Sequence, residues 1–427
     1  MSNRTKNNQN DSTRRSFLKS TAATAAALTA PTFIPARVLG REGAPGANEE
    51  IIIGVIGTGG RANQLMDQVP PPGRIVAIAD CFKFRATETA KKKNKPEWAI
   101  YQDYRQMFDK EKLDALIIAT PDHARTLPCV RAVQAGYDVY AEKPLTAYIE
   151  EGRILVKHVR KHNKIFQVGT QQRTMDINRF CCAFVRDGKL GKLKEVSAVN
   201  YPSSRKYTGL PEETVPETDD WDTWCGPTEL RPFNKQLQFS WMQWHDYSGG
   251  EMTNWGAHGV DQIQWALGKD GTGPTELWPD EKGIINMKYA DGTPVKFERQ
   301  GGPMGGAVFI GEDCKMEINR NKFTTNPPDF VKGAPDPAAQ DAKWEGDGWI
   351  ARPHIQNWLD CVKSRELPNA DVEIGHRSIS VCHLVNLTRQ LKRKLQWDPE
   401  KEQFVNDDEA NKLLVRPRRK GFELPEV

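Results

Sequence analysis

Continuous apolar runs recur along the chain after residue 49. The first run, Glu50–Gly57, reads Glu-Ile-Ile-Ile-Gly-Val-Ile-Gly and contains no polar position after its first residue. Strands that are buried on both faces of a parallel sheet show such runs, whereas half-exposed strands alternate between apolar and polar residues. The pattern therefore predicts a buried parallel strand here. Further strands of this kind are predicted at Arg74–Ala79, Leu113–Ala119, Asp138–Ala141 and Lys164–Val168.

Segments with helical patterning separate these strands. We predict helices at Tyr104–Lys110, His123–Ala135 and Ala147–His162. Strands that alternate with helices favour an open, doubly wound parallel sheet with right-handed connections. Ligands of such sheets bind beyond the carboxyl ends of the strands. The fold class of residues 50–171 is therefore predicted to be α/β.

The second half of the chain has a different pattern, with short strands in hairpin-like succession. Its predicted strands are Leu193–Tyr201, Gly283–Tyr289, Pro294–Arg299, Ala307–Ile310 and Cys314–Ile318. This succession predicts a largely antiparallel, open sheet with one exposed face. Helices are expected near Pro353–Lys363 and Gly375–Lys394. We therefore predict an α+β domain over residues 172–427.

The N-terminal segment has the features of an export signal. Residues 13–19 read Thr-Arg-Arg-Ser-Phe-Leu-Lys, and a weakly apolar Ala/Thr stretch follows over residues 20–30. A charged region, a modest apolar region and small residues near Ala36 are typical of a cleaved signal, and the paired arginines are of the twin-arginine type. We predict a signal peptide over 1–36, a linker over 37–49, passage through the twin-arginine translocase, and a periplasmic or otherwise exported location.

Charge, apolar runs and cysteine spacing exclude several classes of protein. The net charge is +4 with interspersed signs, so no nucleic-acid partner is expected. The basic residues 416–420 are interpreted as a solvated tail. No apolar run approaches the ~20 residues that span a bilayer, so no stable membrane anchor is expected. The eight cysteines show no metal-type spacing, and Cys181 and Cys182 are predicted to be core residues.

The first strand runs directly into a glycine-rich turn of the form G-x-G-x-x-A. Gly57 permits the tight turn, Gly59 lets the backbone approach a pyrophosphate, and Ala62 allows close packing of the following helix. Gly60 and Arg61 complete the turn. The helix N-terminus offers unpaired N–H groups to a phosphate. This order of elements predicts a Rossmann domain that binds a dinucleotide.

An acidic residue follows the second strand at the expected distance. Asp80 lies 23 residues after Gly57, where such a residue normally binds the ribose hydroxyls. A carboxylate there repels a 2′-phosphate, which favours NAD over NADP. NADP stays an alternative because Lys83 and Arg85 follow closely.

At the ends of later strands the chain carries Thr120-Pro121-Asp122-His123 and Glu142-Lys143-Pro144. A third segment, residues 249–261, reads Gly-Gly-Glu-Met-Thr-Asn-Trp-Gly-Ala-His-Gly-Val-Asp. With the glycine turn, this ordered set resembles the Gfo/Idh/MocA family of oxidoreductases, typified by glucose–fructose oxidoreductase and inositol dehydrogenase. The resemblance spans residues 51 to about 265.

The resemblance implies roles for individual residues. Lys143 and His258 match the family's catalytic lysine and histidine, while Thr120, Pro121, His123 and Glu142 lie where the cofactor is bound. Gln172 and Arg173 lie where the family often contacts its substrate. The residue four before the histidine is commonly Asp in the family but is Asn254 here, and an amide does not accept a proton near neutral pH. The family's C-terminal sheet pairs subunits, which implies a homo-oligomer.

The residues also support this chemistry without the family. Oxidation of an alcohol needs a base for the hydroxyl proton, and a buried lysine beside the cationic nicotinamide can act as one. His258 and Asp261 lie three apart on a predicted helix, Trp255–Leu267, so Asp261 could orient the imidazole or contact substrate. The alternatives are a core histidine or a metal site with His245 and Asp246; we predict no metal.

Aromatic residues are concentrated between the predicted elements. Indole faces suit the apolar face of a sugar ring, but such residues can equally form a packed loop core. Both interpretations stay open for the group. Trp241 and Trp244 are the favoured sugar contacts because they adjoin the segment of His258. The group is Tyr201, Tyr207, Trp221, Trp224, Trp241, Trp244, Tyr247 and Trp255.

These patterns leave three functions open. The favoured one is hydride transfer at a carbon of a sugar, cyclitol or glycoside, with tightly bound NAD. Some relatives oxidise a ring carbon, eliminate the aglycone and reduce the ring again, so a redox-neutral glycoside hydrolase is the second. A sugar-binding protein without catalysis is the third, and the intact Glu142-Lys143-Pro144 segment and His258 argue against it.

Overall fold

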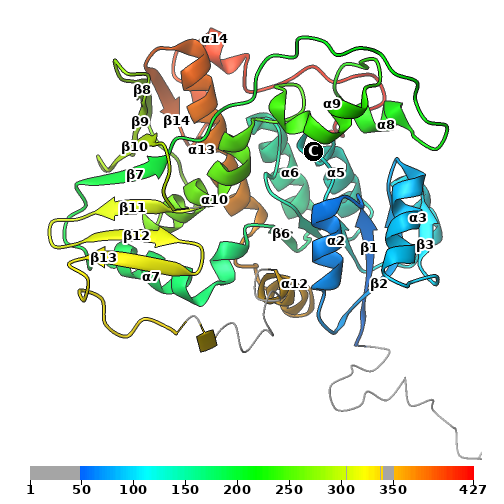
Figure 1. Cartoon of the computed structure of the whole chain (residues 1–427), viewed down its shortest axis with the longest axis horizontal. Coiled ribbons are helices and arrows are strands. Elements are labelled where there is room, and N and C mark those ends of the chain that lie inside the picture. The colour runs from blue at the N-terminus through cyan, green and yellow to red at the C-terminus, as the bar shows by residue number, and fades with distance from the viewer. Residues whose placement is uncertain (1–48, 304, 337, 340–350) are drawn as a thin grey trace, which may run out of the picture. The chain divides into compact units, whose positions relative to one another are not determined.

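The computed structural model describes residues 49–303, 305–336, 338–339 and 351–427. The predicted signal peptide and residues 37–48 of the predicted linker lie outside them. Residues 51–427 cluster as one compact unit that contains two sheets (Figure 1). None of the helices in the described ranges is long and apolar enough to cross a membrane.

The first sheet is the predicted parallel one. Its six strands lie in the order β3-β2-β1-β4-β5-β6, and every pair is parallel. This is the Rossmann order, which confirms the predicted α/β fold. The strands are β1 Ile51–Ile56, β2 Gly73–Ala79, β3 Ala99–Tyr101, β4 Ala115–Ile118, β5 Asp138–Ala141 and β6 Phe166–Val168. The helices between them are α2 Gly60–Asp67, α3 Lys83–Lys92, α4 Tyr104–Lys110, α5 Thr126–Gln134 and α6 Ile149–Lys161.

Both faces of this sheet are covered, which explains the continuous apolar runs. Leu116 and Ile118 of β4 belong to the core that includes α5 and α6, while Ile117 faces the other core, with α2 and α12 (Arg352–Ser364). Successive strand residues point to opposite faces, so each position of β4 is buried. Helix α12 therefore covers part of one face of the first sheet, although it lies far beyond residue 171 in the chain. The predicted domain division at residue 171 stays a prediction.

The second sheet has nine strands in the order β13-β12-β11-β7-β10-β9-β8-β14-β15. Neighbouring strands of this sheet pair antiparallel, except β7 and β10, which pair parallel. The predicted, largely antiparallel character of the sheet is therefore confirmed. Strand β13 escaped prediction because its residues Lys-Phe-Thr-Thr-Asn are partly or fully exposed at the sheet edge. The strands are β7 Glu195–Val199, β8 Glu276–Pro279, β9 Ile285–Lys288, β10 Pro294–Arg299, β11 Ala307–Ile310, β12 Lys315–Asn319, β13 Lys322–Asn326, β14 Leu395–Asp398 and β15 Gln403–Phe404.

Two long helices pack together beside this sheet: α10, Glu251–Ala266, and α13, Val372–Leu391. Helix α10 starts one turn before the predicted Trp255, so Asn254 lies within it. The shorter helices are α7 Asp176–Arg186, α8 Trp221–Cys225, α9 Lys235–Ser240 and α14 Asp408–Asn411, and Gln171–Thr174 and Trp241–Gln243 form single 3-10 turns. The predicted core positions Cys181 and Cys182 are fully buried in α7, which confirms that prediction.

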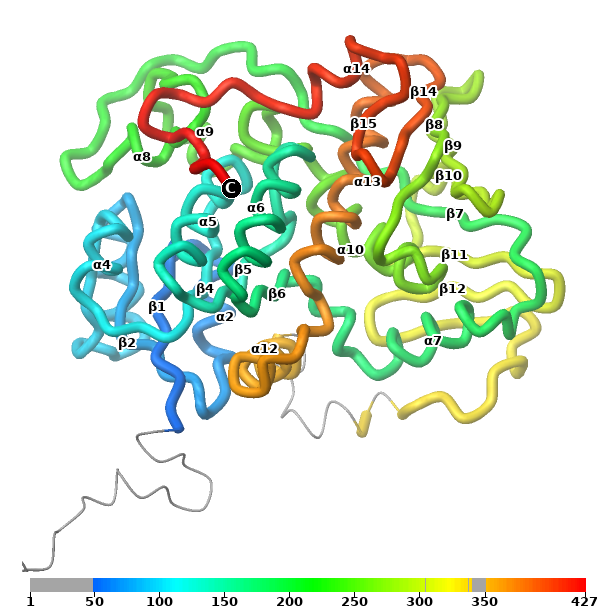
Figure 2. The backbone as a smooth tube through the Cα atoms, turned by 180° about the vertical axis from the view of Figure 1, so that it is seen from behind, coloured from blue at the N-terminus to red at the C-terminus, as the bar shows by residue number. Residues whose placement is uncertain are grey.

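The last residues of the chain return to the first sheet. Both backbone views show the segment after α14 running beside α8 and α5 to the C-terminus (Figure 2). Arg416 and Arg418 are 6% and 10% exposed and both pair with the buried carboxylate of Glu151. The predicted solvated tail is therefore wrong. We call residues 416–427 the C-terminal strap.

Candidate active site

The glycine turn between β1 and α2 is built as the sequence predicts. Gly57 has φ +85°, and a Cβ there would lie 2.9 Å from the carbonyl oxygen of Ala119, so a larger residue is excluded. A Cβ on Gly59 or Gly60 would meet no protein atom within 4 Å. Both glycines line a cavity at the N-terminus of α2, which leaves room and backbone N–H groups for a pyrophosphate. Ala62 is buried in the core, as predicted.

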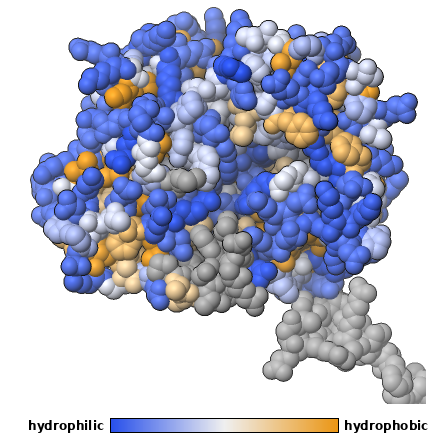
Figure 3. All heavy atoms as spheres, viewed as in Figure 1, coloured by the Kyte–Doolittle hydropathy of each residue, from blue (hydrophilic) through white to orange (hydrophobic). Residues whose placement is uncertain are grey.

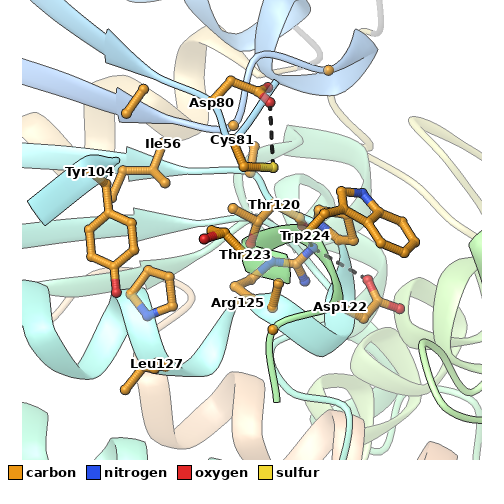
Figure 4. A pocket seen from close by; sticks show the side chains of 18 of the residues that line it. Ile56, Asp80, Cys81, Tyr104, Thr120, Asp122, Arg125, Leu127, Thr223 and Trp224 are labelled. Carbon is orange, nitrogen blue, oxygen red and sulfur yellow. Dashed lines mark hydrogen bonds and ion pairs between the residues drawn. The ribbon is translucent and has the colours of Figure 1, made fainter. Parts of the chain in front are cut away.

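This cavity has a volume of about 620 Å³. One wall consists of the glycine turn, Asp80, residues 119–122, 124–125 and 142–144, at the carboxyl ends of the parallel strands. Residues 222–224, 226–227, Trp241 and the strap residues Gly421 and Phe422 form the opposite wall. Figure 4 shows Asp80, Thr120, Arg125 and Trp224 around this space. The size suits an organic cofactor.

Asp80 lies at the end of β2, where the ribose hydroxyls would be recognised. Its Oδ2 accepts from the backbone N–H and hydroxyl of Thr58, both at 2.8 Å, and its Oδ1 accepts from Phe82 N at 2.9 Å. Arg85 is 4.0 Å away. The carboxylate is thus held in place at the cavity rim, and the donor set fits NAD.

Lys143 reaches across the cavity to α10. Its Nζ donates to Asn254 Oδ1 at 2.5 Å, and the Nδ2 of the same amide donates to Glu251 at 3.0 Å. Burial lowers the pKa of Lys143 below its ordinary value, although the carboxylates of Glu142 and Asp122 oppose this. The residue that departs from the family pattern is therefore the direct partner of the lysine.

Glu142 is paired with Arg61 from the glycine turn. Arg61 Nε donates to Oε1 at 2.8 Å, and Gln171 Nε2 donates to the same oxygen at 3.0 Å. Burial alone would raise the pKa of Glu142, but the adjacent guanidinium lowers it overall. Glu142 does not cap the following helix, since the N-cap of α6 is Tyr148. Glu142 therefore stays ionised and joins β5 to the start of α2.

His258 lies one turn after Asn254 on α10. Its Nε2 is 3.3 Å from a guanidinium nitrogen of Arg320, and its Nδ1 is buried without a partner. Burial, together with the positive charges of Lys143 and Arg320, moves the pKa of His258 well below its ordinary value. Since a guanidinium only donates, Nε2 accepts and the imidazole is neutral.

Asp261 has partners other than His258. Arg173 Nε donates to its two oxygens at 3.0 and 2.8 Å, and Ser378 Oγ donates at 2.8 Å. The prediction that Asp261 orients the imidazole of His258 is therefore wrong, because the carboxylate of Asp261 binds the guanidinium of Arg173 instead. Arg173 also pairs with the partly exposed Asp270, and neither residue lines the cavity. Arg173 and Asp261 thus have structural partners where substrate contacts were expected.

The other predicted contacts divide between cavity and core. Thr120, Pro121 and Trp241 line the cavity, whereas His123 and Trp244 do not. His123 is fully buried, its Nε2 donates to Trp224 O at 2.7 Å, and burial lowers its pKa to about 3. Gln172 donates to Gly305 O at 2.7 Å beside His258. His123 therefore supports the cavity wall from behind.

Most of the aromatic group forms a packed core. Trp221 and Trp224 stack with ring centroids 4.4 Å apart, and Trp244 is 3% exposed within the same cluster. Buried aromatic faces in mutual contact are unavailable to a sugar, so the packed-core interpretation holds for Trp221 and Trp244, whereas Trp224 also lines the cavity. The face seen in Figure 3 is mostly hydrophilic, with hydrophobic side chains in separate small patches.

Arg125 is a residue that the sequence pattern did not identify. It is buried, it donates to the carbonyl oxygens of Thr120 and Pro144, and it pairs with Asp122 at 3.3 Å. One side chain thus joins the ends of two strands that form the cavity wall. Its position two residues after His123 was the available signal. No group of three or more metal-ligating side chains is arranged for a metal within the described residues.

Comparisons with known proteins agree with this geometry. The model described as oxidoreductase family, NAD-binding Rossmann fold, matches residues 51–170, and the family's C-terminal alpha/beta domain matches residues 201–424. The chain belongs to the Gfo/Idh/MocA oxidoreductase family. Its cofactor is NAD, in keeping with the glycine turn and Asp80. A twin-arginine translocation signal sequence matches residues 11–31.

Individual relatives are distant. The chain is 30% identical to scyllo-inositol 2-dehydrogenase (NAD(+)) of Bacillus subtilis over 26% of this chain and 32% of that enzyme, so it spans about a third of this curated relative. The WlbA dehydrogenase of Bordetella pertussis, crystallised with NADH and UDP-GlcNAcA, is 15% identical with a TM-score of 0.60, covering 82% of this chain and 99% of that one. Aldose-aldose oxidoreductase of Caulobacter crescentus is 16% identical with a TM-score of 0.58, and the match covers 81% of this chain and 99% of that one. These structures share the fold.

Proposed function

We propose that the chain is an exported, NAD-dependent oxidoreductase that transfers a hydride to or from a carbon of a sugar, cyclitol or glycoside. The observation that carries the proposal is the position of Lys143. Its ammonium group lies in the same cavity as the glycine turn and Asp80, and it contacts α10, the helix that carries His258, through Asn254. A dinucleotide and a proton acceptor are thereby brought to one space.

The residues divide the work by their chemistry. NAD, when bound, supplies the hydride acceptor. The glycine turn and the α2 N-terminus would hold its pyrophosphate, and Asp80 would hold its ribose. Lys143, with its pKa lowered by burial, takes the proton of the substrate hydroxyl as the carbonyl forms. Asn254 positions that amine and, as a neutral amide, accepts no proton.

His258 is the second member of the proposed proton-transfer pair. As the structure stands, Arg320 occupies its Nε2. Lys143 is therefore the group that is ready to accept the first proton. His258 enters the reaction once Nε2 is released to a substrate hydroxyl.

The test is a survey of substrates with the mature protein. NADH absorbance is recorded with aldoses, cyclitols and glycosides, and product release from glycosides is recorded in parallel. NADH formation or consumption with at least one class supports the proposal. Cleavage of a glycoside without net NADH would instead establish the redox-neutral hydrolase. NAD binding combined with neither reaction across the panel would refute both.

A further inference from the structure

Arg320 is a cation without an anionic partner. It lies in the turn between β12 and β13, with its guanidinium 5.2 Å from the ring centroid of Trp255 and 3.3 Å from His258 Nε2. Its Nε is buried and makes no hydrogen bond. Within the part of the chain that the structure describes, no carboxylate lies within ion-pair distance of it.

Several other buried arginines of the described residues contact a carboxylate, although some of them also keep a buried nitrogen without a hydrogen bond. Arg173 binds the carboxylates of Asp261 and Asp270. Arg389 donates to two side-chain and backbone oxygens at 2.5 and 2.8 Å, with further acceptors nearby. A guanidinium held only by a neutral ring nitrogen and an indole face is therefore unusual in this protein, and buried donors without acceptors cost free energy.

Charges of both signs act on Arg320, and the positive charge of Arg61 has the larger effect. Burial and Arg61 lower the pKa of the Arg320 guanidinium, while the carboxylate of Glu142 opposes this. The charges of Lys143 and Arg320 both lower the pKa of His258. The carboxylate of Glu142 is taken by Arg61, and Glu251 accepts from Asn254. The region around Asn254 and His258 of α10 therefore carries an excess of positive charge, which favours an anionic ligand.

We propose that Arg320 binds a carboxylate of the substrate, so that the substrate class is a sugar acid, either a uronic or an aldonic acid. This inference rests on the proposed function, because it assigns a substrate group to the same site. The free edge of one planar guanidinium matches two oxygens of a carboxylate or of a phosphate. A carboxylate is favoured because its single negative charge is balanced by one guanidinium, whereas a phosphate brings about −1.5 to −2 charges. The contact with His258 places that group beside the proposed proton-transfer residues.

Binding of a carboxylate also changes the partner of His258. Arg320 now donates to Nε2, and a carboxylate is the stronger acceptor for that guanidinium. Engagement of the carboxylate draws the donor away and releases Nε2 to the substrate hydroxyl. A sugar acid would thereby complete the site, whereas a neutral sugar would leave Nε2 occupied.

The experiment measures sugar binding to NAD-loaded protein by calorimetry, and kcat/KM where turnover is seen. The probes are D-glucuronate, D-galacturonate and D-gluconate, with D-glucose and D-galactose as neutral counterparts and D-glucose 6-phosphate as the phosphate counterpart. Loss of one charge-assisted hydrogen-bonded pair corresponds to about 10- to 100-fold in affinity. We expect the acids to bind at least about 10-fold more tightly than the neutral sugars, and Arg320→Met to abolish this preference.

Two further variants keep the result interpretable. Arg320→Lys retains the charge without the fork and should keep part of the preference. Arg179→Met removes an exposed arginine of α7 and should leave the preference for sugar acids unchanged. Equal or tighter binding of the neutral sugars overturns the inference and leaves the proposed function standing. Tighter binding of the sugar phosphate also overturns it, and NAD binding without any sugar binding or turnover overturns both.

Discussion

Lys143 and Asn254 are joined by a 2.5 Å hydrogen bond in a buried part of the cavity. Removing water from an ammonium group destabilises its charged form. The neutral carboxamide next to it offers no compensating charge, as an aspartate would. At this position the departure from the family pattern therefore favours a neutral, proton-accepting lysine.

Replacement of Lys143 should remove the proton acceptor. We expect Lys143→Ala to reduce turnover by at least ~10²-fold, the usual contribution of a general acid–base group. Turnover is measured by NADH absorbance with a substrate found in the survey. The exposed Lys91→Ala serves as control and should behave as wild type. Near-normal turnover of Lys143→Ala would show that another group takes the proton.

The lowered pKa of Lys143 also predicts a pH profile. The amine accepts a proton only when neutral, so the rate of alcohol oxidation should be present above its pKa and fall as the pH drops through it. Because burial lowers that pKa, the inflection of kcat/KM should lie below the ~10.4 of a free lysine. Asn254→Asp adds a carboxylate beside the ammonium and should move the inflection upward. An unchanged profile in that variant would contradict the assignment.

Asp80 should select the unphosphorylated dinucleotide. Its fixed carboxylate would face a 2′-phosphate with like charge. We expect the apo protein to bind NAD at least ~10-fold more tightly than NADP, as measured by titration. Asp80→Ser should reduce the difference between the dissociation constants for NAD and NADP. Tighter binding of NADP by the wild type would assign the phosphate to Arg85, which lies 4.0 Å from Asp80.

At the scale of elements, the C-terminal strap closes one side of the cofactor cavity. Arg416 donates to Glu151 at 2.7 Å and to His123 O at 2.7 Å, which ties the strap to α6 and to the end of β4. Arg419 donates to Gly226 O at 2.9 Å and pairs with Asp222 at 2.6 Å, which ties the strap to α8 and its C-cap in the same cavity wall. Gly421 and Phe422 then line the cavity itself.

Loss of the buried Glu151 carboxylate should loosen this closure. Glu151→Gln leaves Arg416 and Arg418 buried without a countercharge, which costs about 3–5 kcal/mol. We expect a lower melting temperature and faster release of bound nucleotide, measured by thermal unfolding and by dialysis. The exposed neighbour Glu150→Gln is the matched control. If Glu151→Gln retains nucleotide as well as that control does, the strap has no part in retention.

At the scale of the whole molecule, the signal sequence and the cavity bear on the same question. Residues 11–31 match a twin-arginine signal, and we propose that the protein acquires NAD before export. No nicotinamide pool is expected outside the cytoplasm, so a freely exchanging cofactor would be lost. A cavity closed by two chain segments favours slow dissociation, which is the step that mostly sets affinity.

Cofactor retention can be measured directly. The mature protein is purified, dialysed extensively and denatured, and the released nucleotide is assayed. We expect bound nucleotide close to one per chain and redox-neutral turnover, with either a second carbonyl or the same substrate returning the hydride. A protein that emerges empty and needs millimolar added NAD would contradict retention while leaving the fold unaffected.

The accuracy of the sequence predictions varied with the range of the interactions involved. The β1 turn, Asp80 and the strand end at Lys143 were located correctly because each depends on a few consecutive residues and a known sheet order. Helical spacing suggested an Asp261–His258 contact, but Arg173, 88 residues away in the chain, takes that carboxylate. Spacing along one helix specifies which side chains share a face, and it does not specify what packs against that face.

The sequence by itself determined the two-sheet architecture, the dinucleotide turn and the family, because apolar periodicity and glycine conformation act locally. Only the tertiary structure decided which polar groups meet. It paired Glu142 with Arg61, placed Arg320 on His258, packed most of the aromatic group into one cluster, and turned an apparently solvated tail into a cavity wall. A charged side chain near a sheet end has several partners within reach, and the choice among them depends on burial and on segments far apart in the chain.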